Sequence, residues 1–141
     1  MRHAGFSLLE LIVVLGLLAT LLGAALPPAL RWRDALAVRA ARDEVVSALA
    51  WTRVAAVARG GARLVIEPSS GRVRTETAGA ARIHVDLARR YGVSLEGERA
   101  TIEIGYDALG IGRGANRTLI LRRGAARASV IVSLYGRVRA W

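Results

Sequence analysis

Few residues in this 141-residue chain have side chains suited to catalysis or metal binding. The chain has no Cys and two His, His3 and His84. A metal site or a nucleophile–His pair needs several such groups together, so we expect no metal site, no cofactor and no catalytic residue. Glu96, Glu98 and Glu103 could act as paired carboxylates, but a solvated strand-and-loop face explains their spacing better. The sequence therefore argues against an enzyme.

One carboxylate, Glu10, stands directly before a long apolar stretch. Residues 11–30 contain no charged side chain. This run has the length that a helix needs to cross the apolar core of a bilayer. The stretch is too long for the apolar region of a secretory signal peptide. Arginines flank it on both sides, so the charges leave its orientation open. A carboxylate in a membrane segment is costly, so Glu10 is either a snorkelling side chain at a helix end or a functional group.

Residues 31–59 predict an amphipathic helix that ends at the pair Gly60-Gly61. Upstream, Pro27 and Pro28 are expected to break the helix, because Pro28 has no N–H and disfavours helical backbone at Pro27. Small and apolar residues recur at three- and four-residue spacing and form the stripe expected in the core: Val38, Ala41, Val45, Ala48, Leu49, Thr52 and Ala56.

The remainder of the chain predicts short strands separated by turns. We expect strands at residues 62–67, 72–77, 83–87, 93–95, 101–104, 117–122, 128–134 and 136–140, with a loop at 106–110. One long helix followed by an antiparallel meander is an α+β layout. The helix would bury its apolar stripe against the sheet.

The start of the chain carries a specific motif. Residues 5–10 read GFSLLE and are followed by the apolar run, with Pro27 inside it. This string resembles the class III signal peptide of the type IV pilin superfamily, with an unusually short leader. The resemblance implies that prepilin peptidase cuts between Gly5 and Phe6 and methylates the new amine of Phe6. It also implies that Glu10 lies beside the Phe6 amine of a neighbouring subunit during assembly, where the two charges would offset each other's desolvation.

Two further segments narrow the resemblance. Residues 47–60 and 132–138 resemble the late helix and the final strands of the GspH/FimT family, the minor pseudopilins of type II secretion and minor pilins of type IV pili. The resemblance implies a cleaved leader (1–5), a transmembrane and filament-core helix (6–30) and a periplasmic pilin-like domain (31–141), made of a helix at 31–59 and a β-region at 62–140.

The same resemblance implies a location, partners and a role. The chain would cross the inner membrane once, with its domain facing the periplasm or the exterior. Its partners would be prepilin peptidase and other pilins or pseudopilins. Its role would be structural, as a subunit that initiates or caps a filament.

Positive charge is concentrated at the end of the chain. All 21 basic residues are Arg, the formal net charge is +10, and the last acidic residue is Asp107. Such a patch favours anionic partners, and the arginine fork suits bidentate contact with phosphate. The candidate DNA-binding residues are the seven arginines of this last segment: Arg113, Arg117, Arg122, Arg123, Arg127, Arg137 and Arg139.

Residues 136–139 read Gly-Arg-Val-Arg. In a strand, Arg137 and Arg139 would share a face about 7 Å apart, and Trp141 could add a stacking surface. Some FimT-like minor pilins that act as DNA receptors in natural transformation carry Gly-Arg-x-Arg here, so the resemblance implies DNA reception as an alternative function. The same four letters recur at residues 71–74, where a turn and an exposed strand explain them. A basic face can also meet an acidic neighbouring pilin or lipid head groups.

Overall fold

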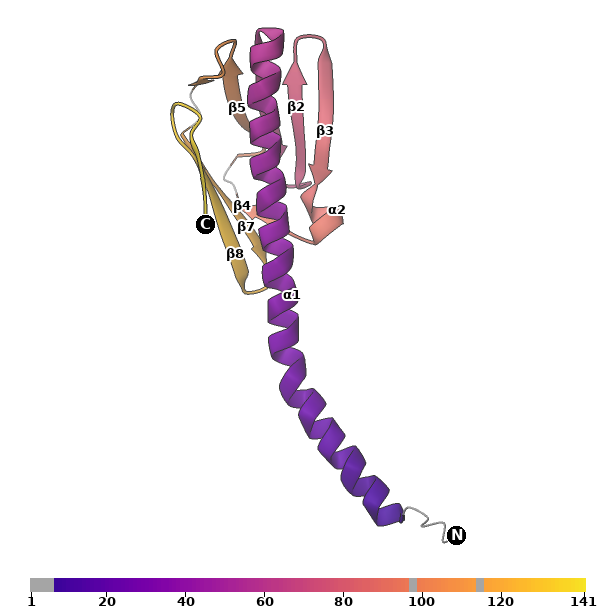
Figure 1. Cartoon of the computed structure of the whole chain (residues 1–141). Coiled ribbons are helices and arrows are strands. Elements are labelled where there is room, and N and C mark those ends of the chain that lie inside the picture. Colours follow the sequence, from indigo (N-terminus) through magenta and orange to yellow (C-terminus); the bar gives the residue numbers. More distant parts are fainter. Residues whose placement is uncertain (1–6, 97–98, 114–115) are drawn as a thin grey trace, which may run out of the picture. The chain divides into compact units, whose positions relative to one another are not determined.

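The computed structural model describes residues 7–96, 99–113 and 116–141 (Figure 1). The predicted leader, the cleavage site at Gly5 and Phe6, and Glu98 lie outside the described residues. The chain divides into two compact units, residues 1–33 and 34–141. One long helix, α1 (Leu8–Arg59), contributes to both units.

Helix α1 has a defined start and a defined end. The Ser7 hydroxyl accepts a hydrogen bond from the Glu10 N–H (3.2 Å), and the Ser7 carbonyl accepts from the Leu11 N–H. Ser7 is therefore the N-cap, and Ser-x-x-Glu is a capping sequence. The helix ends at Arg59, as predicted, because Gly60 (φ +78°) and Gly61 (φ +142°) leave the helical region.

The predicted helix break at Pro27 and Pro28 is wrong, because α1 continues through both prolines. Proline fixes φ near −65°, which is itself a helical value. The two missing N–H groups remove only the hydrogen bonds that the carbonyls of Gly23 and Ala24, four residues earlier, would accept. A following proline disfavours helical backbone without forbidding it, and here the flanking helix prevails.

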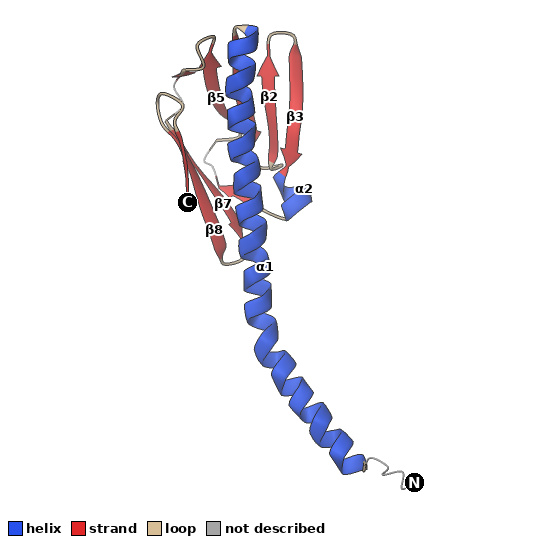
Figure 2. Ribbon diagram, in the orientation of Figure 1, coloured by secondary structure: helices blue, strands red, loops and turns tan. Residues whose placement is uncertain are grey.

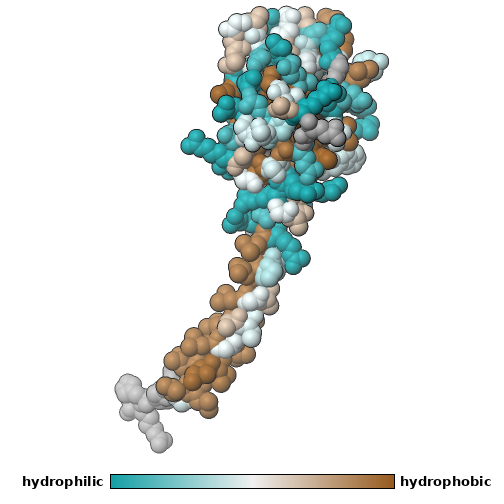
Figure 3. Space-filling view, turned by 180° about the vertical axis from the view of Figure 1, so that it is seen from behind, coloured by the Kyte–Doolittle hydropathy of each residue, from teal (hydrophilic) through white to brown (hydrophobic). Residues whose placement is uncertain are grey.

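The first half of α1 is apolar on all sides. Residues 8–30 are exposed throughout, and α1 is the one helix in the described residues that is long and apolar enough to cross a membrane. Its Leu, Ile and Val side chains form the hydrophobic surface coloured brown in Figure 3. Exposed apolar side chains in such number require a membrane or a protein partner to cover them.

Two antiparallel sheets follow α1. Their strands are drawn red in Figure 2. Sheet A has the order β3-β2-β1-β5-β6, and sheet B has the order β4-β7-β8-β9. The strands of sheet A are β1 (Gly61–Glu67), β2 (Arg72–Thr77), β3 (Ala80–Asp86), β5 (Ile102–Asp107) and β6 (Gly112–Arg113). Those of sheet B are β4 (Ser94–Glu96), β7 (Arg117–Arg123), β8 (Ala126–Val132) and β9 (Val138–Ala140). A short helix, α2 (Leu87–Tyr91), connects β3 to β4.

The core lies between α1 and the inner faces of both sheets. Every member of the predicted helix stripe is buried, and Ala55 joins them. The apolar members of the stripe share one cluster with Leu64 and Ile66 of sheet A and with Leu119 and Leu121 of sheet B. Burying one such aliphatic side chain contributes about 1.5–3 kcal/mol. The long helix packed against antiparallel sheets confirms the predicted α+β class.

Some predicted strand boundaries are wrong. The strand expected at residues 83–87 begins at Ala80, and Leu87 already belongs to α2. There the Asp86 carboxylate caps α2 by accepting from the Arg89 N–H (2.8 Å). The loop expected at 106–110 begins two residues later, because β5 continues to Asp107 by pairing with Gly61. The ends of these strands depend on contacts with segments distant in the sequence, which local residue patterns do not encode.

Candidate functional site

The outer face of sheet B, the face directed away from α1, brings together four of the seven candidate arginines. On β7 and β8 the buried residues alternate with outward ones, so Arg122 and Arg127 point outward from directly opposite positions. On β9, Arg139 lies opposite the outward Ile131. Arg137 precedes β9 and lines the same surface as Arg139 and Ile131.

The other three candidates lie elsewhere. Arg113 belongs to β6 of sheet A and pairs with Asp107 (3.1 Å). Arg123 faces the opposite side of sheet B, where it pairs with Asp34 of α1 (2.9 Å) and donates to the Tyr91 carbonyl. Arg117 has the core-facing parity of β7, and its guanidinium turns back to the Asn116 carbonyl (3.0 Å). The seven arginines therefore do not form one surface.

The four arginines of the outer face differ in charge balance. Arg122 forms an ion pair with Glu96 of β4 (2.9 Å), which offsets the repulsion expected between opposed Arg122 and Arg127. Within the described parts of the chain, Arg127, Arg137 and Arg139 contact no carboxylate. Among the residues that the structure describes, this face therefore keeps three exposed guanidinium groups without a carboxylate partner.

Gly136 positions the arginines that follow it. Its φ is +79°, and a Cβ there would lie 2.6 Å from Cε1 of the buried Tyr106 ring. The turn is held by hydrogen bonds from the Arg137 N–H to the Ser133 hydroxyl (3.0 Å) and from the Ser133 N–H to the Arg137 carbonyl (2.9 Å). Only glycine fits this turn, which returns the chain along β8 as β9.

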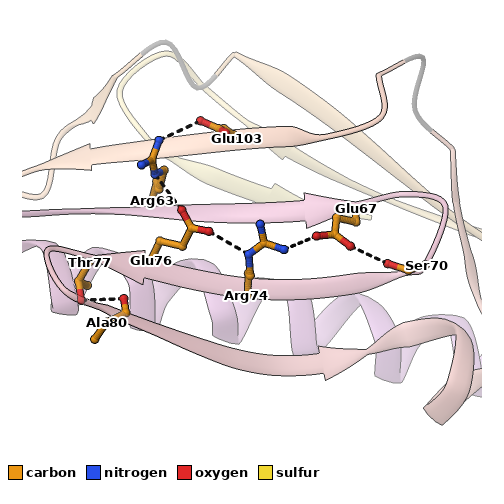
Figure 4. Close-up of polar contacts among 8 residues, drawn as sticks. All are labelled: Arg63, Glu67, Ser70, Arg74, Glu76, Thr77, Ala80 and Glu103. Carbon is orange, nitrogen blue, oxygen red and sulfur yellow. Dashed lines mark hydrogen bonds and ion pairs between the residues drawn. The ribbon is translucent and has the colours of Figure 1, made fainter.

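The second Gly-Arg-Val-Arg, residues 71–74, has a different environment. The Arg74 guanidinium lies between two carboxylates of sheet A, Glu67 and Glu76, and donates to both. Arg63 bonds the same Glu76 (3.1 Å) and Glu103 (3.5 Å), which completes the chain of contacts in Figure 4. We call these five residues the sheet A ion-pair ladder. Donation from Arg74 lowers the pKa of Glu67, and Glu76 and Glu67 raise the pKa of Arg74.

The histidine of the described chain has a structural environment. His84 lies on β3, and its Nε2 is 2.8 Å from the Thr75 hydroxyl, which is 2.5 Å from the Thr52 hydroxyl. Thr52 donates to the Ala48 carbonyl, so the order of donors runs from His84 through Thr75 to Thr52. Burial and the nearby Arg82 lower the pKa of His84. No group of residues suited to a metal ion occurs in the described residues.

Two residues with defined roles were missed at the level of sequence. Ser7 caps α1 next to Glu10, and the Ser-x-x-Glu spacing could have revealed it. Asp107 organises the turn after β5, since one carboxylate oxygen accepts from the N–H groups of Leu109 and Ile111. The pKa of Asp107 is lowered, mainly by the hydrogen bond from the Ile111 N–H and further by Arg113 and by the Leu109 N–H. Asp107 lies four residues before Ile111, and Asp side chains commonly accept hydrogen bonds from the backbone of the turn that follows them. Its position was the signal available in the sequence.

Comparison with known proteins adds one finding. The family model described as the prokaryotic N-terminal methylation motif matches residues 1–26. No curated protein and no solved structure matches the chain. A long N-terminal helix packed against antiparallel sheets is the type IV pilin-like architecture. Together with this architecture, the methylation motif at residues 1–26 indicates a type IV pilin- or pseudopilin-like precursor, and it implies processing by prepilin peptidase and assembly with other pilins.

Proposed function

We propose that this chain is a minor pilin or pseudopilin of the GspH/FimT type, a structural subunit that initiates or caps a filament. The observation that carries the proposal is the methylation motif at residues 1–26, joined to a helix whose first half is exposed and apolar on all sides. Such a helix needs a membrane before assembly and neighbouring helices after it. We place the cleaved leader at residues 1–5, the membrane and filament segment at 6–30, and the periplasmic or external domain at 31–141.

Glu10 is the proposed assembly residue. It lies exposed in the first turn of α1, where the Ser7 hydroxyl already bonds its backbone N–H. Its carboxylate would meet the methylated amine of Phe6 of a neighbouring subunit. Bringing an ammonium and a carboxylate together in apolar surroundings removes the cost of leaving either charge unpaired there.

Processing and assembly can be tested on the full chain, expressed with a prepilin peptidase and its filament partners. Mass spectrometry should show loss of residues 1–5 and one added methyl group on Phe6, and Gly5→Leu should block the cut. Glu10→Gln should be cleaved normally but enter filaments poorly, whereas the matched variant Asp43→Asn, on the exposed side of α1, should enter normally. An uncut wild-type chain, or normal entry of Glu10→Gln, would contradict the proposal.

A second candidate function is DNA reception in natural transformation, favoured by Arg127, Arg137 and Arg139 on the outer face of sheet B. Arg74 of the other Gly-Arg-Val-Arg lies among glutamates, so the two motifs are not equivalent as anion sites. Each arginine that contacts a phosphate should contribute about one unit to the salt dependence of binding.

The test compares DNA binding by the full chain in detergent over a salt series. Arg137→Ala/Arg139→Ala should weaken binding and flatten the slope of affinity against salt by about two units. Arg89→Ala/Arg90→Ala is the matched control, since it removes the same charge from two exposed arginines of α2. Equal behaviour of the two variants would mean generic charge attraction, which any basic protein shows at low salt.

A further inference from the structure

The outer face of sheet B carries the same set of chemical groups twice. Two hollows of about 410 Å³ each lie on it. Each contains an aromatic ring, an isoleucine, at least one arginine and a serine hydroxyl. The Trp141 hollow is lined by Thr118, Ile120, Arg127, Ala128, Ser129 and Trp141. The Tyr135 hollow is lined by Asn116, Ile131, Ser133, Tyr135, Arg137 and Arg139.

The aromatic rings of both hollows are open to solvent. Trp141 is 69% exposed and Tyr135 is 74% exposed, so neither ring belongs to the core. The backbone of Trp141 is held nonetheless, because its N–H and carbonyl both bond to Ser129 of β8 (3.0 and 3.1 Å). An exposed tryptophan whose backbone is held in this way is a pre-positioned flat surface rather than packing material.

Arginines flank the Trp141 ring on both strands. Arg139 lies two residues earlier on β9, about 7 Å away along the strand. Arg127 lies two residues from Ser129 on β8, which makes it the diagonal neighbour of Trp141 at about 7–8 Å. Aromatic rings and arginines thus follow one another across the face, from Tyr135 through Arg137 and Arg139 to Trp141.

We propose that this face binds single-stranded nucleic acid, with one base stacked on Trp141, another on Tyr135, and phosphates held by Arg127, Arg137 and Arg139. The proposal rests on the DNA-binding candidate function and specifies its ligand. A single strand repeats a planar base and an anionic phosphate, which is the alternation that the face presents. An acidic protein segment would use the arginines but would offer no repeated planar rings.

The same geometry disfavours a duplex as the ligand. In a duplex the faces of the bases are stacked on one another, so Trp141 and Tyr135 could not reach them except at an end. Reading base edges requires a helix or a two-stranded ribbon that enters a groove. The hollows are recesses in the face of a sheet and do not protrude into a groove, so a duplex would gain only phosphate contacts here.

Fluorescence anisotropy with the full chain in detergent tests the inference. The probes are a labelled oligothymidine, a duplex of equal length and an abasic oligomer of equal length, all at one salt concentration. Oligothymidine should bind most tightly. Trp141→Ala should weaken its binding by about five- to a hundredfold and leave duplex binding unchanged, and Trp141→Phe should restore most of the affinity. Trp32→Ala, which removes another exposed tryptophan, should have no effect.

The outcomes distinguish binding of single strands by base stacking from DNA reception, the candidate function on which it rests. If none of the three probes binds, DNA reception and the stacking inference both fail. If the three probes bind equally and Trp141→Ala changes nothing, DNA binding stands and stacking on Trp141 is overturned. If the abasic oligomer binds the wild type as tightly as oligothymidine does, the face recognises phosphate without bases, which also overturns the inference. Near-ultraviolet circular dichroism of each variant confirms that its fold is retained.

Discussion

The sequence Gly-Arg-Val-Arg occurs twice in this molecule, and the two copies make its most informative comparison. Each copy begins with a glycine at positive φ, Gly71 (+68°) or Gly136 (+79°), where a Cβ would collide with its surroundings. Each then directs its last arginine away from the core. Both copies thus combine a glycine turn with an outward last arginine, so the difference in the surroundings of that arginine comes from the neighbouring strands.

The neighbours differ because of strand order. Residues 72–74 lie in β2, between β1 and β3, where Glu67 of β1 and Glu76 of β2 itself enclose Arg74. Residues 138–139 lie in β9 at the edge of sheet B, beside a strand with no acidic residue. One copy is neutralised inside a sheet, and the other stays available at an edge. A short charged motif therefore acquires its role from sheet topology.

The largest effects should come from the feature that the copies share. Gly71→Ala places a methyl group 2.8 Å from the Ala88 backbone nitrogen, and Gly136→Ala places one 2.6 Å from the Tyr106 ring. Left-handed backbone at a non-glycine residue costs about 1–2 kcal/mol, and overpacking costs about 1–3 kcal/mol. We expect each variant to lose about 2–4 kcal/mol in the free energy of unfolding of residues 34–141, measured by denaturant titration in detergent.

Gly79→Ala is the control for these glycine variants. Gly79 also has a positive φ (+80°), but a methyl group added there would have nothing within 4 Å. Its loss should reflect backbone strain alone, about 1–2 kcal/mol. If all three variants lose the same amount, close packing is not what requires glycine in the two motifs.

The next largest effect on stability should distinguish the two Gly-Arg-Val-Arg copies. Arg74→Ala leaves Glu67 and Glu76 without the cation between them, and both side chains are only partly exposed. We expect its Tm to fall by a few degrees, whereas Arg139→Ala should leave Tm unchanged because Arg139 has no ion pair in the described chain. Thermal unfolding followed by near-ultraviolet circular dichroism measures both. A fall for Arg139→Ala as large as for Arg74→Ala would mean that the outer face of sheet B is also internally paired.

Acid should weaken the ion pairs around the Gly-Arg-Val-Arg of sheet A, residues 71–74, and leave the surroundings of residues 136–139 unchanged. The pKa of Glu67 lies below its ordinary value of 4.5, mainly through the hydrogen bond from Arg74. A lowered pKa in the folded state stabilises the fold above the unfolded value, and this stabilisation is lost as pH falls through the folded pKa. Tm should therefore fall below about pH 4.5, and less steeply in Glu67→Gln. Arg139→Ala should follow the wild type at every pH.

Much of the fold follows from residue patterns that are local. Three- and four-residue spacing identifies the buried stripe of α1, since packing on a sheet demands that spacing. Gly60-Gly61 identifies the end of the helix. Pro27 and Pro28 mislead, because the cost of two missing hydrogen bonds does not by itself end a long helix. The extension of β5 to Asp107 depends on its pairing with Gly61, far earlier in the chain, which no local pattern contains.

The candidate site was only partly predictable for the same reason. Strand alternation correctly places Arg137 and Arg139 on one surface. The sequence could not reveal that Arg123 would turn inward to Asp34, or that Arg113 would bind Asp107 in the other sheet. Those partners lie in distant segments or depend on how a turn closes, so charge counted along the chain overstates the charge available on any one face.

The smallest effects should come from the first arginine of each copy. Arg72 and Arg137 are exposed, and neither forms an ion pair in the part of the chain that the structure describes. The hydrogen bonds at Arg137 use its backbone, which alanine keeps. Arg72→Ala and Arg137→Ala should each change the free energy of unfolding by less than about 0.5 kcal/mol. A loss in Arg72→Ala that approaches the loss in Arg74→Ala would show that Glu67 depends on both arginines, and the sheet A ion-pair ladder would then include the whole motif rather than its last residue.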